Sequence, residues 1–254
     1  MESKKEFALI GYPLGHSYSK TYFAKKFQEL GITNAAYQTF PLSDLSKIHN
    51  LVRSHRNLVG LNVTTPYKEF VIPYLSEVDP LVLKIGTVNT ISIFREDDMY
   101  NLKGYNTDID GLRKLLLSMS PQGIQKALIL GSGGSGKTTA FALKEMGIDY
   151  KFVTRKDSSR NRISYSQLNA RLIAEHKLIV NASPVGMHPH YHDFPAIPYE
   201  GIGGEHICID LVYNPEETLF MKKSAERGAA VANGLTMLYE QADKAFEIWQ
   251  RDVL

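Results

Sequence analysis

The chain has 254 residues, 43% of them hydrophobic, which is enough apolar material for one large domain or two small ones. Its 29 basic and 27 acidic side chains nearly cancel, so its charge gives no reason to expect a nucleic acid or an anionic membrane as partner. The single cysteine excludes an intramolecular disulfide, and the sequence shows neither a signal peptide nor an apolar run of about 18 residues. We therefore expect a cytoplasmic protein with a small-molecule partner.

Strand and helix patterns alternate through the first part of the chain. Short apolar runs predict the strands, and apolar residues at helical spacing predict the helices between them. We expect a strand at 7–10, a helix at 20–30, a strand at 36–40, a helix from 43 to 55, a strand at 58–64, and a hairpin of strands 88–94 and 99–102. This order favours a mostly parallel sheet with helices on its faces.

A second series of strands and helices follows a predicted helix at 109–119. We expect strands at 127–130, 150–154, 178–181, 206–212 and 229–233, and helices at 135–146, 165–176, 218–227 and 235–251. Such a series is typical of a doubly wound nucleotide-binding unit. The fold class is therefore α/β with two domains that meet near residue 103, and we expect ligands in a cleft between them at the carboxyl ends of the strands.

A glycine-rich turn, GSGGSG at 131–136, joins the strand at 127–130 to the next helix. Glycines let the backbone approach a ligand closely, and a helix N-terminus attracts anions, so this turn predicts a phosphate site. The same residues fit both G-x-G-x-x-G, a dinucleotide motif, and, with Lys137-Thr138, the P-loop motif of nucleotide triphosphatases. Asp210 could serve the second motif as a magnesium ligand. The turn alone leaves both interpretations open.

Polar side chains also gather where strands of the first series end. The sets are Ser17 and Ser19; Asn62, Thr64 and Lys68; Thr87, Asn89 and Thr90; and Asn106 and Asp108. Hydroxyls and amides of this kind can hydrogen-bond a small polyhydroxylated acid, although each one alone is also a common turn residue. Lys68 stands out, because a lysine at the entrance of a cleft can carry a proton to and from a substrate.

Taken together, these motifs resemble the shikimate dehydrogenase family. Seven segments match the family's motifs in its order and span the chain: 11–19, 60–68, 86–90, 104–108, 181–187, 210–215 and 234–242. The resemblance implies NADP-dependent interconversion of shikimate and 3-dehydroshikimate, a step toward the aromatic amino acids. It also implies a substrate domain of residues 1–103 plus 235–254 and a Rossmann-like NADP domain of residues 104–234, with the last helix returning to the first domain.

The resemblance assigns the glycine turn to the pyrophosphate of NADP rather than to a nucleotide triphosphate. The cofactor residues that it implies are Gly131, Ser132, Gly133, Gly134, Ser135, Thr154, Arg155, Lys156, Ser183 and Gly234. The cations Arg155 and Lys156, directly after the second strand of this unit, favour a 2′-phosphate and hence NADP over NAD. Thr154-Arg155-Lys156 departs from the family's usual asparagine-arginine-threonine but keeps the arginine.

The resemblance further implies a catalytic pair, Lys68 and Asp108, with no metal. It implies that Ser17 and Ser19 bind the substrate carboxylate, with Tyr213 near it, and that Thr64, Asn89 and Gln241 bind hydroxyls. Lys20 replaces a common family proline, which bears on where the helix after Ser19 starts. Rivals are a quinate/shikimate dehydrogenase using NAD or NADP, a silent binding protein and a P-loop enzyme. The partners expected are the small-molecule substrate and, as an assembly, a homodimer.

Overall fold

The structure, a computed structural model, describes residues 4–15, 18–155 and 161–254. Within these ranges the strands form two six-stranded sheets with helices on their faces, which confirms the predicted α/β class. The chain divides into two compact units, Met1–Thr107 with Gln241–Leu254, and Asp108–Glu240. Within the described ranges no helix is both long enough and apolar enough to cross a membrane.

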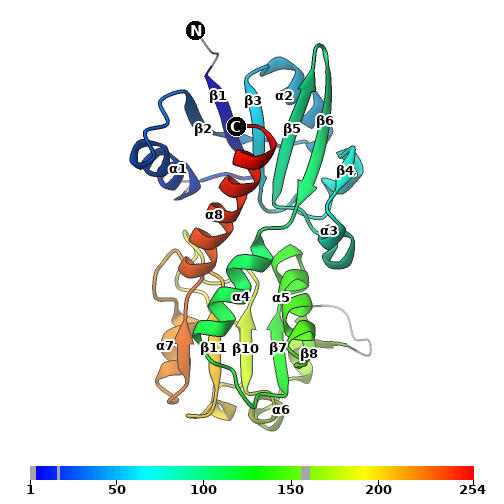
Figure 1. Cartoon of the computed structure of the whole chain (residues 1–254). Coiled ribbons are helices and arrows are strands. Elements are labelled where there is room, and N and C mark those ends of the chain that lie inside the picture. Colours follow the sequence, from blue (N-terminus) through cyan, green and yellow to red (C-terminus); the bar gives the residue numbers. More distant parts are fainter. Residues whose placement is uncertain (1–3, 16–17, 156–160) are drawn as a thin grey trace. The chain divides into compact units, whose positions relative to one another are not determined.

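The first unit is built on a mixed sheet with the strand order β2-β1-β3-β5-β6-β4 (Figure 1). Its elements are β1 (Lys5–Gly11), α1 (Tyr18–Glu29), β2 (Ala35–Pro41), η1 (Leu45–Lys47), α2 (Ile48–Ser54), β3 (Leu58–Val63), η2 (Ile72–Tyr74), β4 (Glu77–Val78), α3 (Pro80–Ile85), β5 (Thr90–Glu96) and β6 (Met99–Tyr105). Strand β1 pairs in parallel with β2 and β3, whereas β3, β5 and β6 pair antiparallel as the predicted hairpin requires.

Two apolar cores cover the two faces of this first sheet. On one face, aromatic residues of α1 pack with the last helix, α8 (Leu235–Asp252); Phe23 stacks on Tyr37, and Trp249 is fully buried. Gly60 makes room for this tryptophan, because a Cβ there would lie 2.6 Å from its Nε1. On the other face, α2 packs over β1, β3 and β5. Helix α8 therefore completes the core of the unit that begins the chain.

The second unit contains a fully parallel sheet with the order β12-β11-β10-β7-β8-β9. Its elements are α4 (Asp108–Ser118), β7 (Lys126–Leu130), α5 (Gly134–Glu145), β8 (Asp149–Thr154), β9 (Arg162–Ser164), η3 (Tyr165–Gln167), α6 (Ala170–Glu175), β10 (Leu178–Asn181), η4 (Tyr199–Gly201), β11 (Ile207–Asp210), α7 (Leu219–Ala225) and β12 (Ala230–Ala232). The order reverses between β7 and β10, and ligands of doubly wound sheets bind at that point.

Some short elements differ from the sequence-based prediction. Strands β4 and β9 and helix α3 were not predicted, because segments of two to six residues carry no readable periodicity. The single helix predicted at 165–176 is wrong: Asn169 caps a new helix by accepting from the Leu172 N–H at 2.9 Å, which separates α6 from the turn η3. Helix α1 starts at Tyr18, so Ser19 and Lys20 lie in its first turn.

Candidate functional site

The glycine turn between β7 and α5 has the geometry of an anion cradle. Gly131 has a φ of 109°, a region that favours glycine, and its N–H donates to Val153 O at 3.0 Å. A Cβ on Gly136 would lie 2.3 Å from Gly131 O, so this glycine lets the helix pack closely on the turn. A Cβ on Gly133 would meet nothing within 4 Å. The N-terminus of α5 therefore offers N–H groups beside open space.

The P-loop interpretation finds no support in the side chains that it needs. Thr138 is fully buried, and its hydroxyl donates to Gly134 O at 3.1 Å within the helix instead of facing a magnesium site. Asp210, the other magnesium candidate, is also fully buried and accepts three hydrogen bonds from protein groups. Among the residues that the structure describes, no group of three or more His, Cys, Asp or Glu side chains could hold a metal ion.

The other candidate cofactor residues lie after strands β8, β10 and β12 of the same parallel sheet. Thr154 ends β8 and the exposed Arg155 follows it, while Ser183 lies in the loop after β10 and Gly234 between β12 and α8. Because β7, β8 and β10 are parallel neighbours, their carboxyl ends reach the same edge of the sheet. The second unit thus gathers the described candidates at one edge. Lys156 lies outside the described residues.

Asp210 holds the loops after β10 and β11 in place. Its carboxylate accepts from Asn181 Nδ2 at 2.9 Å, from Val212 N at 3.0 Å and from Thr218 Oγ1 at 2.6 Å. Asn181 in turn accepts from the N–H and the hydroxyl of Ser183. Burial raises the pKa of Asp210 to about 6, although the three hydrogen bonds act in the opposite direction. The P-loop alternative would make Asp210 a metal ligand, whereas the structure shows a loop anchor.

Asp210→Asn is expected to change how stability depends on pH. The folded-state pKa lies above the ordinary value of 3.8, so the carboxyl contributes stability that is present below pH about 4 and is lost as the pH rises through about 6. A shift of about two units corresponds to about 3 kcal/mol. Urea titrations should therefore show the unfolding free energy of the variant rising relative to wild type between pH 4 and 7, by about that amount. A difference that stays constant across this range would contradict the assignment.

The first unit brings Thr64, Lys68 and Asn89 together through backbone bonds between β3 and β5. Val63 N donates to Asn89 O at 2.8 Å, and Val88 N donates to Lys68 O at 2.7 Å. Thr64 and Lys68 are half-buried, and the turn between them is closed by Tyr67 N donating to Thr64 O at 3.0 Å. The lysine is thus held beside the strand end that carries Asn89.

Gln241 joins this group from the far end of the sequence. Its Oε1 accepts from Asn89 Nδ2 at 3.2 Å, although the two residues are 152 positions apart. Asn89 is also bonded to Thr107, the Tyr37 hydroxyl donates to Asn62 Oδ1 at 2.7 Å, and Ser19 is half-buried in the first turn of α1. Tyr37 was not predicted as a member of this group, because its sequence context is that of an ordinary strand residue. Thr107 was noted only as part of the 104–108 motif.

Three predicted substrate or catalytic residues remain. Asp108 is the first residue of α4 and is buried at 4% exposure, while Tyr213 is half-buried in the loop after β11; both belong to the second unit. Ser17 lies outside the described residues. Asp108 and Tyr213 are therefore placed by the elements of the second unit, at the start of α4 and after β11.

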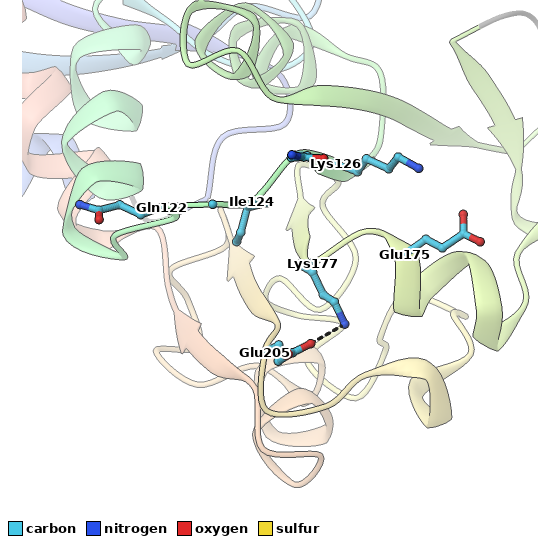
Figure 2. Close-up of a pocket in the computed structure, with 8 residues that line it drawn as sticks. Gln122, Ile124, Lys126, Glu175, Lys177 and Glu205 are labelled. Carbon is cyan, nitrogen blue, oxygen red and sulfur yellow. Dashed lines mark ion pairs between the residues drawn. The ribbon is translucent and has the colours of Figure 1, made fainter.

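A surface hollow of about 490 Å³ lies at the opposite edge of the second sheet (Figure 2). It is lined by residues at or just before the starts of β7, β10 and β11, including Lys126, Lys177 and Glu205. Lys177 pairs with Glu205 at 3.0 Å, as Figure 2 shows, so opposite charges already meet there. Since ligands of such sheets bind at the carboxyl ends of the strands, this hollow is separate from the candidate site.

Comparisons with known proteins cover both units. Residues 9–91 match the model of the shikimate dehydrogenase substrate binding domain. A shikimate dehydrogenase (NADP(+)) from Carboxydothermus hydrogenoformans is 35% identical over 261 residues, covering 95% of this chain and 90% of that protein. Shikimate dehydrogenase 1 from Peptoclostridium difficile is 35% identical with a TM-score of 0.83, covering 98% of this chain and 93% of that one. Shikimate 5-dehydrogenase from Thermus thermophilus, solved with NADP(H) and shikimate, is 30% identical with a TM-score of 0.82, covering 97% and 94%.

Proposed function

Because the chain belongs to the NADP(+)-dependent shikimate dehydrogenase family, we propose that it interconverts shikimate and 3-dehydroshikimate on the route to the aromatic amino acids. The similarity over 95% of the chain, through both units, carries this proposal. Several proteins that are 31% to 36% identical over 95% of the chain are named shikimate dehydrogenase (NADP(+)), so the proposal does not rest on a single motif. A location in the cytoplasm and a homodimeric assembly are further parts of the proposal.

The cradle of the second unit suits the phosphates of NADP. When bound, NADP would supply the hydride acceptor for oxidation at C3 of shikimate. The N–H groups at the start of α5 would bind the pyrophosphate, and the open space at Gly133 would let it approach the backbone. The exposed Arg155, aided by Thr154 and Lys156, would bind the 2′-phosphate. Ser183 and Gly234 would line the same edge of the sheet.

Gly133→Ala is expected to weaken NADP binding about tenfold while the stability of the protein stays within about 0.5 kcal/mol of wild type. The backbone of Gly133 has φ −75° and ψ −168°, which alanine can adopt, and no atom would lie within 4 Å of the added methyl. The methyl would instead stand where the pyrophosphate approaches. Calorimetric titration with NADP and thermal unfolding measure the two quantities. Unchanged NADP affinity would contradict this role for the turn.

We assign the proton transfer to Lys68, with Asp108 as its partner. Oxidation of the C3 hydroxyl to a ketone releases one hydride and one proton, so the reaction requires a proton acceptor as well as the cofactor. Lys68 would take the hydroxyl proton and return it in the reverse direction. Asp108 would orient the lysine and hydrogen-bond the substrate. Ser17, Ser19 and Tyr213 would bind the carboxylate, and Thr64, Asn89 and Gln241 the hydroxyls.

The proposal is tested by following the absorbance of reduced nicotinamide. The purified protein is mixed with NADP or NAD and, in turn, with shikimate or quinate. We expect the absorbance to rise with NADP and shikimate. A comparable rise with NAD and quinate would instead indicate a quinate/shikimate dehydrogenase. No rise with any of the four pairs would overturn the proposed reaction.

A further inference from the structure

A buried polar network occupies the first unit where β3 and β6 end and β5 begins. Asn62, Asn89, Thr90 and Thr107 are each no more than 5% exposed. Polar groups are expensive to bury unless they are hydrogen-bonded, and each bond in such a network therefore constrains its neighbours. Asn89 is the member of this network that we assigned to the substrate.

Thr107 fixes the orientation of the Asn89 side-chain amide from two sides. The Thr107 N–H donates to Asn89 Oδ1 at 2.6 Å, and Asn89 Nδ2 donates to Thr107 Oγ1 at 2.9 Å. A backbone N–H can only donate, so it decides which end of the amide is oxygen and which is nitrogen. The second N–H of the amide is then directed at Gln241 Oε1, 3.2 Å away.

The rest of the network keeps the Thr107 hydroxyl in place. Its Oγ1 lies 3.1 Å from Thr90 Oγ1, and Thr90 accepts from Asn62 Nδ2 at 3.2 Å. Asn62 Nδ2 also donates to the backbone carbonyl of Asn89 at 3.2 Å. Both the main chain and the side chain of Asn89 are therefore held by the same set of buried groups.

We propose that Thr107 is a positioning residue for substrate binding: it turns the second Asn89 N–H, rather than the amide oxygen, toward Gln241, on the side where both residues would bind a substrate hydroxyl. The inference rests on the proposed function, because it takes Asn89 and Gln241 as ligands of shikimate. Thr107 itself is fully buried and acts on the substrate only through Asn89. Thr107 directly precedes Asp108, the first residue of α4, so the residue that orients the Asn89 amide is also the last residue before that helix.

Thr107→Val and Thr107→Ser separate the hydroxyl from the rest of the side chain. Valine keeps the shape but leaves an Asn89 N–H without its acceptor, so we expect the KM for shikimate to rise about tenfold. The KM for NADP and kcat should stay within about threefold, because neither depends on this amide. Serine keeps the hydroxyl and should restore the KM for shikimate to within about twofold of wild type. Thr107→Ala serves as a second variant without the hydroxyl if valine impairs folding.

Ser92→Ala is the matched control. Ser92 is a fully buried hydroxyl on β5 that donates to Asp252 at 2.8 Å, so its loss affects stability without touching Asn89. An unchanged KM for shikimate in both variants without the hydroxyl, an equal rise in Ser92→Ala, or failure of serine to restore binding would overturn the positioning role. Absence of turnover in the wild-type protein would overturn the proposed function instead, and the inference with it.

Discussion

Replacing Lys68 by alanine is expected to lower kcat by about 10³-fold while shikimate affinity stays within about threefold of wild type. The substitution deletes the group that we assign to proton transfer but leaves the residues assigned to the carboxylate and the other hydroxyls. The backbone around it should persist, because Lys68 O is held by Val88 N and not by the side chain. Single-turnover kinetics and calorimetric titration of shikimate measure the two effects separately.

Lys84→Ala is the control for this experiment. Lys84 is an exposed lysine in the last turn of α3, in the same unit, and its removal makes the same change in net charge. Turnover by this control should be unchanged. If Lys68→Ala kept near-wild-type kcat and mainly lost shikimate affinity, Lys68 would be a binding residue and the proton acceptor would have to be sought elsewhere.

Arg155→Ala is expected to lower kcat/KM for NADP about 50-fold while that for NAD changes less than about threefold. A guanidinium bonded to a phosphate is a charge-assisted pair that contributes a few kcal/mol, and only NADP carries the 2′-phosphate. Arg155 follows the end of β8, the strand next to the glycine turn, and its side chain is exposed, so its removal should leave the fold intact.

The selectivity of this effect is what identifies the role. Lys144→Ala removes an exposed cation at the other end of α5 in the same unit. This control should leave kcat/KM unchanged for both NADP and NAD. If Arg155→Ala lowered kcat/KM equally for NADP and NAD, the substitution would have a general effect on dinucleotide binding or on the fold. In that case the preference for NADP would have to come from another group.

The sequence predicted the elements that follow from local chemistry. The alternation of apolar runs identified the long strands, and Gly131 to Gly136 identified the turn, because only glycine suits such a conformation and such close packing. Short elements such as α3 depend on a cap and one turn, which leave too little pattern to read. The role of Asp210 could not be read from the sequence, since a carboxylate at a strand end looks the same whether it faces a ligand or anchors loops.

The polar network shows why site geometry could not be predicted fully. Asn89 and Gln241 lie far apart in sequence, and their bond exists only because α8 packs on the first sheet. Thr107 acts through its backbone N–H and its hydroxyl, and both are ordinary groups that also occur in turns, so its residue type carries no signal of that role. The roles of the site residues themselves came from the family resemblance rather than from residue chemistry alone.

The path of α8 has a consequence for how the protein is made. This helix begins in the second unit, ends in the first, and supplies Phe246 and Trp249 to a core that also contains Phe7 and Phe23. A ribosome makes Phe7 and Phe23 more than 200 residues before Phe246 and Trp249, so the first unit cannot close its aromatic core until the second unit has been synthesised. Until then, the nascent first unit exposes the face that α8 will cover, whereas residues 108–240 have already emerged. The first unit, although its strands are made first, therefore completes its core only after the second unit has been made.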